Sequence, residues 1–219
     1  MILSDLRREL KQNSDPDTQK SSLRFFKEEI RLYGVKTATV QKIGKKFFQQ
    51  IKTKTKAEIF DLCEELWQSG IQEESYVACN WSYYIRDQYE PGDFKILERW
   101  VGNYVTNWAS CDTLCNHTVG SFLDMYPEFA VNLKTWARSE NRWMRRGSAV
   151  SLIIPARKGR FHNNCLEIAG ILLQDGQGEM LIKLLSLVNV VNEKHNDQIN
   201  TGTLIRFLGE ICWFPSSQR

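Results

Sequence analysis

The sequence predicts an all-α protein built from a repeated pair of helices. Apolar residues recur at helical spacing in almost every segment, and the alternation typical of half-buried strands is nearly absent. The chain has only five prolines, and four of them punctuate helical segments, because a residue without a backbone N–H interrupts a helix. These observations favour short helices joined by tight turns.

The first half of the chain is expected to form six helices. Polar residues around Pro16 separate the first two, and Gly34 ends the second, since glycine suits the left-handed conformation at a helix C-terminus. The third carries an apolar stripe from Val40 to Ile51, and Gly70 ends the fourth. The predicted helices are 2–12, 18–33, 36–52, 56–69, 73–88 and 93–105.

The second half continues with helices predicted at 107–125, 128–137, 141–154, 163–173, 179–192 and 197–211. Helix pairs recur at roughly 35–40 residues, near the period of HEAT-type repeats. Such pairs bury one face against each neighbour and leave a concave surface for a partner. We therefore predict a single HEAT-like α-solenoid domain across residues 1–219, with a closed helical bundle as the alternative.

Charge is distributed in blocks along the chain, although the net charge is only +3. Residues 20–56 contain eleven Lys or Arg and two Glu, and residues 134–160 contain eight Lys or Arg and one Glu. Between them, residues 58–98 contain ten acidic residues and two basic ones. Two basic blocks fit either solvated helix faces or the two arms of a phosphate-binding surface. We expect the concave surface to be basic.

Other features narrow the class of protein. No apolar stretch reaches the roughly 18 residues of a transmembrane helix, and residues 1–8 lack the apolar region of a signal peptide. We therefore expect a cytoplasmic protein without membrane contact, and a monomer. Six cysteines without a CxxC pair predict free thiols, and Cys111, Cys115 and His117 provide too few ligands for a zinc site. No nucleotide, redox or metal motif occurs, so no cofactor is expected.

Three stretches carry a family resemblance. Residues 24–37 join an aromatic-basic segment to a Gly-hydrophobic-x-Thr turn, residues 105–115 contain a Trp-x-x-x-Asp pattern, and residues 141–149 supply arginines about one repeat later. Through these three stretches the chain resembles the AlkD-type family of DNA alkylation-repair glycosylases, and the resemblance covers roughly residues 1–182. The resemblance implies a HEAT-like fold and excision of positively charged alkylated purines, N3-methyladenine and N7-methylguanine, from duplex DNA.

The Trp-x-x-x-Asp pattern consists of Trp108 and Asp112. Residues four apart share one face of a helix, and an indole beside a carboxylate favours a developing cation. Glycosidic cleavage passes through an oxocarbenium-like sugar, and a cationic purine leaves as a neutral base without a general acid. The resemblance makes Asp112 the catalytic carboxylate. Without it, a surface or capping carboxylate and a core tryptophan would be the simpler interpretations.

The arginine run contributes Arg142, Arg145 and Arg146. We expect all three to face away from the core, where a guanidinium can hold a phosphate at two points. The resemblance assigns the phosphate contact to Arg146, with Arg145 and Arg142 as its neighbours; a solvated basic rim is the alternative. Phe25 occupies an aromatic position that lines the substrate surface in this interpretation, although a core position is the simpler one.

The chain also departs from the family pattern. The family places a second active-site tryptophan about 40 residues beyond the arginine, and residues 183–190 contain none. Residues 183–219 are therefore interpreted as a diverged or truncated final repeat. The alternative function is a catalytically weak or inactive HEAT-like scaffold that binds DNA or protein, including an acidic protein held by the basic arms.

Overall fold

The structure is a computed structural model that describes residues 2–173. Within this range the regular elements are helices, apart from one isolated bridge between Arg31 and Ile71, which confirms the predicted all-α fold. The α-helices are α1 (Ile2–Gln12), α2 (Pro16–Leu23), α3 (Thr37–Ile51), α4 (Lys56–Gln68), α5 (Gln72–Tyr84), α6 (Phe94–Asn103), α7 (Trp108–Thr113), α8 (Gly120–Met125), α9 (Asn132–Ala137), α10 (Arg142–Val150), α11 (Ile153–Arg157) and α12 (His162–Leu172).

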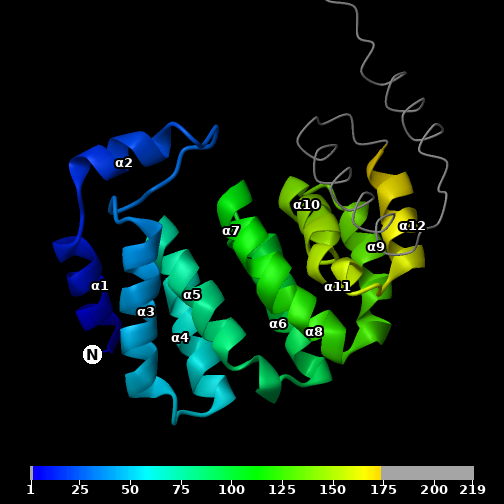
Figure 1. Ribbon diagram of the computed structural model, residues 1–219, viewed down its shortest axis with the longest axis horizontal. Helices are drawn as coiled ribbons and strands as arrows, with labels where there is room; N and C mark the ends of the chain where they lie inside the picture. Colours follow the sequence, from blue (N-terminus) through cyan, green and yellow to red (C-terminus); the bar gives the residue numbers. More distant parts are fainter. Residues whose placement is uncertain (1, 174–219) are drawn as a thin grey trace, which may run out of the picture.

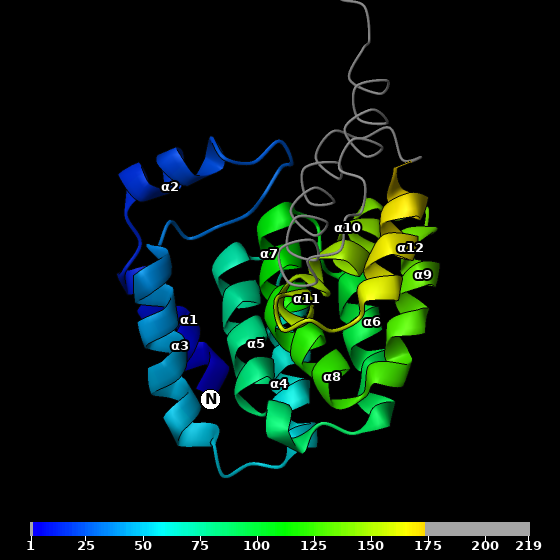
Figure 2. The same ribbon diagram turned by 45° about the vertical axis from the view of Figure 1, so that its right-hand side comes forward.

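The helices pack as successive pairs (Figures 1 and 2). Helix α1 packs on α3, α4 on α5 and α9 on α10, while α6 packs on the helix that runs from α7 to α8. Contacts between α3 and α5, α5 and α7, and α7 and α10 join each pair to the next. The second helices of the pairs begin at Thr37, Gln72, Trp108 and Arg142, at intervals of 34 to 36 residues. This rhythm confirms the predicted helical repeat.

An aromatic cluster holds the later pairs together. Phe94 packs on Phe122, Phe129 and Trp136, with ring centroids 5.0 to 5.6 Å apart. Phe94, Phe122 and Trp136 are almost completely buried. Replacement of any one of these three by alanine should therefore lower the free energy of unfolding by about 3–5 kcal/mol. The cluster therefore joins α6, α8 and α9.

The predicted helix 18–33 is wrong beyond its first turns. Helix α2 ends at Leu23 and buries no residue, so burial adds little to extend it. The Glu73 carboxylate instead accepts hydrogen bonds from the backbone N–H groups of Tyr33, Gly34 and Val35, at 2.9 to 3.0 Å. The carboxylate thus takes the place of the backbone carbonyl groups that would accept these hydrogen bonds in a helix. Residues 24–36 therefore cross the top of α3 as an irregular segment (Figure 1).

Gly34 has the backbone conformation that this segment requires. Its φ is +88°, and a Cβ there would lie 2.7 Å from Gln19 Cβ and 2.8 Å from the Asp15 carbonyl oxygen. Gly34→Ala should therefore lower the free energy of unfolding by about 2 kcal/mol or more in chemical denaturation. Gly92→Ala is the matched control, because nothing lies within 4 Å of a Cβ there. Equal stability of the two variants would contradict this account.

Other predicted helices are divided into shorter elements. The predicted helix 107–125 is continuous in space, but the π-helix η3 (Leu114–Val119) separates α7 from α8. The predicted helix 141–154 ends at Val150, and α11 follows with Pro155 inside it. The predicted helices 73–88 and 128–137 each include a 3-10 segment, η1 (Arg86–Gln88) and η4 (Pro127–Val131), and a further 3-10 helix, η2 (Pro91–Asp93), precedes α6. The π-helix matters most for the site, since it starts two residues after Asp112.

The remaining predictions about organisation fall partly beyond the described range. The helices predicted at 179–192 and 197–211, and the truncated final repeat at 183–219, lie outside residues 2–173. The single domain across 1–219 therefore stays a prediction. Within residues 2–173, no helix combines the length and the apolar character needed to cross a membrane.

Candidate active site

Trp108 and Asp112 line one small cavity at the start of α7. The cavity has a volume of about 180 Å³. Helix α7 contributes both residues, one turn apart, and the opposite walls come from Thr37 and Gln41 of α3 and Tyr76 and Asn80 of α5. The shared helix face predicted from the four-residue spacing is therefore confirmed.

Asn107 fixes the beginning of this helix. Its side-chain oxygen accepts hydrogen bonds from the backbone N–H groups of Ala109 and Ser110, both at 3.0 Å, which caps the helix N-terminus. Its amide nitrogen donates to Gln72 Oε1 of α5 at 2.7 Å. Asn107 is 3% exposed, so this bond joins α7 to α5 in the interior and sets the position of Trp108.

Arg146 forms a two-point ion pair with Asp112. Its Nε donates to Oδ1 at 2.8 Å and its Nη2 donates to Oδ2 at 3.1 Å. The side chains are 7% and 15% exposed, so the pair lies almost entirely within the protein. The next residue, Gly147, lets α10 come close to the π-helix η3 that follows α7, because a Cβ there would lie 3.1 Å from Cys115 Sγ. The two-point geometry holds the Asp112 carboxylate in one orientation.

The predicted outward orientation of Arg146 is wrong. It lies three residues after Trp143 and four before Val150, both buried, so helical spacing places it on the same inward face. A guanidinium can occupy that face only with a partner, and Asp112 supplies one. The phosphate contact that the family resemblance implies for Arg146 stays a prediction.

The other two arginines lie nearer the surface. Arg142 pairs with Glu28 at 3.3 Å and lies over the Trp143 ring, 4.5 Å from its centroid. Arg145 Nη1 donates to the backbone carbonyls of Ser139 and Glu140, both at 2.8 Å, beyond the end of α9. Arg142 therefore links α10 to the irregular segment 24–36, whereas Arg145 secures the α9–α10 turn.

The segment 24–36 also covers one side of Trp108. The indole Nε1 donates to the Phe25 carbonyl oxygen at 3.2 Å, and the Phe26 ring stacks on the indole with centroids 5.7 Å apart. Trp108 is 37% exposed, so part of its surface still faces solvent. Phe25 is 74% exposed, which excludes a core position, and its substrate-lining role stays a prediction.

A larger cleft adjoins the Asp112 cavity. It has a volume of about 510 Å³ and shares Gln41, Asn80 and Thr113 with the smaller cavity. Lys42, Lys45, Tyr83 and His117 also line it. Burial lowers the pKa of His117, which favours its neutral form. The combination of two lysines and two aromatic rings suits a polynucleotide backbone and its bases.

The cysteines near the site serve packing. Cys111 Sγ donates to the Trp143 carbonyl oxygen at 3.6 Å. The neighbouring His117 ring packs on the Tyr83 ring. Within residues 2–173 no group of three metal-ligating side chains comes together. The five cysteines described are free and buried, as predicted, and Cys212 lies outside the described residues.

Residues 6–182 match the family described as DNA alkylation repair enzyme. The chain belongs to this family. Membership gives the protein a general role in the repair of alkylated DNA, with DNA as its substrate. The match ends close to residue 182, where the predicted resemblance ends. Residues 169–218 also match a family of unknown function, and no curated protein matches the chain.

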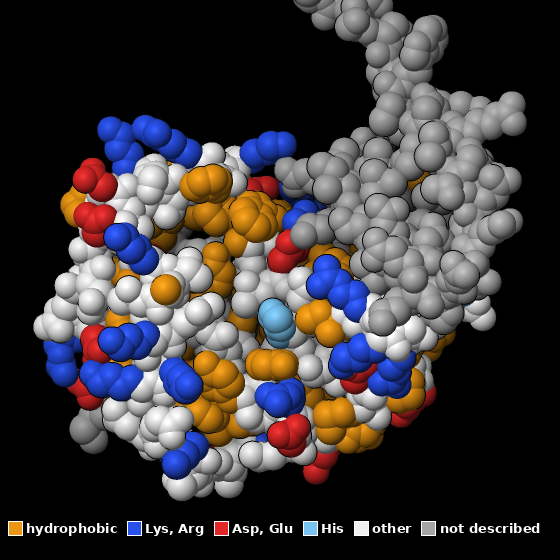
Figure 3. All heavy atoms as spheres, in the orientation of Figure 1, with side chains coloured by type: hydrophobic (Ala, Val, Ile, Leu, Met, Phe, Trp, Pro, Cys, Tyr) orange, Lys and Arg blue, Asp and Glu red, His pale blue; other side chains and the backbone are white. Residues whose placement is uncertain are grey.

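The charge distribution around the site is mixed. Lys and Arg side chains lie along the upper edge and across the face in Figure 3, with acidic and apolar side chains among them. The concave basic surface therefore stays a prediction for this member of the family. Sequence reasoning missed Gln41, Tyr76 and Asn80, because polar residues on helices give no signal of a shared cavity.

Proposed function

We propose that the protein is a monofunctional DNA glycosylase that hydrolyses the N-glycosidic bond of positively charged alkylated purines in duplex DNA. The observation that carries the proposal is the pairing of Asp112 with Trp108 at one cavity of a DNA alkylation repair protein. N3-methyladenine and N7-methylguanine are the proposed substrates, because each leaves as a neutral base.

Asp112 is the proposed catalytic residue. Its carboxylate would stabilise the positive charge that develops on the sugar as the glycosidic bond breaks, and would orient the attacking water. Arg146 is a positioning residue in this proposal. It holds both carboxylate oxygens, so the charge is fixed in place before the substrate arrives and no reorganisation is needed during the reaction.

Trp108 is the second residue of the proposed active site. The face of an indole attracts a cation, so its exposed part suits either the cationic base or the sugar. Phe25 lies beside it on the surface and is proposed to line the substrate. Arg142 and Arg145, which lie nearer the surface of α10, are proposed as phosphate contacts together with Lys42 and Lys45 at the adjoining cleft.

The test is release of N7-methylguanine from a duplex that contains it, together with binding of the same duplex at several salt concentrations. We expect base release, and binding that weakens steeply with salt, because phosphate contacts release counterions. Salt-sensitive binding without release would favour the scaffold function. Binding that does not depend on salt would contradict a DNA-binding role for the two basic blocks.

Arg142 provides a more specific prediction about binding. Its ion pair with Glu28 must compete with any phosphate, since side chains of both residues are partly exposed. Glu28→Gln should therefore tighten duplex binding by about two- to five-fold at low salt, in the range of a surface ion pair. Fluorescence anisotropy with labelled duplex measures this. Glu128→Gln removes the same charge at an exposed position of η4, and an equal effect there would show that only overall charge matters.

A further inference from the structure

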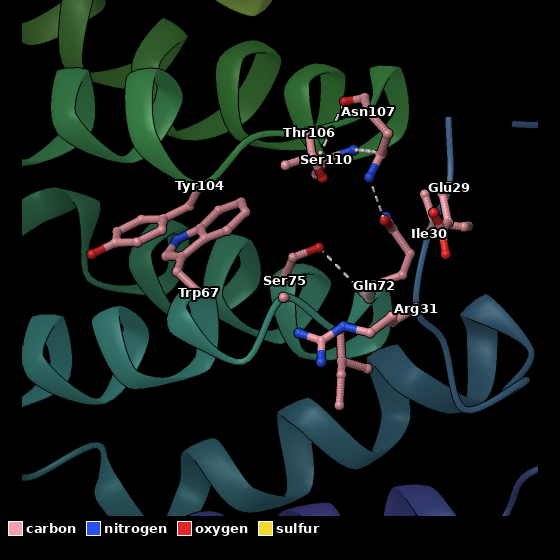
Figure 4. Close-up of a pocket in the computed structure, with 12 residues that line it drawn as sticks. Glu29, Ile30, Arg31, Trp67, Gln72, Ser75, Tyr104, Thr106, Asn107 and Ser110 are labelled. Atoms are coloured by element: carbon pink, nitrogen blue, oxygen red, sulfur yellow. Dashed lines mark hydrogen bonds between the residues drawn. The ribbon is translucent and has the colours of Figure 1, made fainter. Parts of the chain in front are cut away.

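A second cavity is lined by Asn107, the residue that caps the helix of the active site (Figure 4). It has a volume of about 250 Å³. The turns before α5 and α7 form its inner wall, and the irregular segment 24–36 forms its outer wall through Glu29, Ile30 and Arg31. The inner wall is polar and buried: Gln72, Ser75, Asn107 and Ser110 are each 2% to 7% exposed.

Two buried N–H groups on side chains that line this cavity have no hydrogen-bond partner within the described residues. They are Trp67 Nε1 and Gln72 Nε2. Burial raises the pKa of the Tyr76 phenol and the Gln72 amide partly offsets that rise, but no hydrogen bond of normal geometry joins the two. Buried donors without acceptors are unfavourable by about 1–3 kcal/mol each, so the cavity favours a ligand that carries acceptors.

The cavity also offers acceptors. Ser75 Oγ donates to the Gln72 carbonyl oxygen at 2.7 Å and Ser110 Oγ donates to the Asn107 carbonyl oxygen at 3.2 Å. Each hydroxyl oxygen therefore keeps lone pairs for a donor on a ligand. Trp67 and Tyr104 add aromatic surface on one side (Figure 4). A ligand that fits has donors and acceptors along one edge of a flat ring.

Charge at the cavity mouth selects against an anion. Glu29 and Arg31 are both exposed on the same outer segment, so their charges largely cancel. Arg31 Nη2 already donates to the Ser69 carbonyl oxygen at 2.5 Å. A neutral ligand is favoured over a phosphate, for which an uncompensated cation would be expected.

We propose that this cavity binds a nucleobase through the buried polar wall of Gln72, Ser75 and Ser110. A purine or pyrimidine presents donors and acceptors on one edge, and glutamine side chains pair with such edges. The base is either free or displaced from a DNA strand. The proposal rests on the DNA substrate of the proposed function, but not on base excision.

The cavity is connected to the active site through hydrogen bonds. Gln72 Oε1 accepts from Asn107, and Asn107 caps the helix that carries Trp108 and Asp112. A base bound to Gln72 would therefore contact the same network that positions α7. Occupancy of the cavity should be detected at α7 as well as at the cavity wall.

The test uses the full chain and the nuclear magnetic resonances of the Trp67 indole and the Gln72 and Asn107 side-chain amides. The probes are adenine, inorganic phosphate and a duplex with a single bulged adenine. We expect adenine or the bulged duplex to shift these resonances, and phosphate to leave them unchanged. Shifts with free adenine identify a free base as the ligand, whereas shifts only with the bulged duplex identify a base in DNA.

The matched variants are Thr106→Tyr and Thr53→Tyr. Thr106 is exposed and lines the cavity, so a tyrosine there should block the mouth and weaken adenine or bulged-duplex binding by about tenfold or more. Thr53 is exposed in the α3–α4 turn and should leave binding unchanged. The proposal is overturned if only phosphate shifts these resonances, or if none of the three probes shifts them. Base release measured separately shows whether the proposed function fails independently.

Discussion

Asp112→Asn should lower the rate of N7-methylguanine release by about 10²–10³-fold, the range seen when one electrostatic group is removed from a reacting centre. Asparagine keeps the size of the side chain and one acceptor for Arg146, but it removes the negative charge that stabilises the sugar cation. Single-turnover release from a duplex containing N7-methylguanine measures the chemical step. Duplex binding should change little, because the substitution removes no cation.

The control for this prediction is Asp61→Asn. Asp61 lies on the exposed face of α4, so the variant makes the same change in net charge away from the cavity. Base release by Asp61→Asn should equal that of the unaltered protein. If Asp112→Asn also releases the base at the unaltered rate, another group performs the catalysis and the proposed role of Asp112 is wrong.

Sequence patterns identified the fold and the core of the site for different physical reasons. Helical periodicity depends on local spacing, so it located α1, α3 and α4 within one or two residues and put Trp108 and Asp112 on one face. The cavity they share also needs Gln41 and Asn80, which belong to other repeats. Their proximity depends on how the pairs stack, and single residues on a polar helix face carry no such information.

Two failures have tertiary causes. The segment 24–36 leaves the helical state because the Glu73 carboxylate, some 40 residues later, takes its backbone N–H groups. Arg146 faces inward because its partner lies 34 residues earlier on α7. Helical spacing from Trp143 and Val150 does predict that Arg146 faces inward. An arginine on a buried face is unusual, however, unless a carboxylate is already known to lie opposite.

Arg146→Met should destabilise the protein more than any surface substitution. The variant removes the guanidinium that binds both Asp112 carboxylate oxygens, at a position where the carboxylate is only 15% exposed. Breaking a buried pair in this way lowers the free energy of unfolding by about 3 kcal/mol, which chemical denaturation measures. Arg138→Met is the control, because Arg138 is exposed and donates a hydrogen bond to the backbone carbonyl oxygen of Lys134.

The double variant Arg146→Met, Asp112→Leu separates stability from catalysis. Replacement of both charges by apolar side chains removes the buried carboxylate together with its guanidinium, so the double variant should recover most of the stability that Arg146→Met loses. It should still fail to release N7-methylguanine, since the catalytic carboxylate is absent. If Arg146→Met keeps full base release despite its lower stability, Arg146 contributes to folding alone. Reduced release in a variant that remains folded would instead support its role in positioning Asp112.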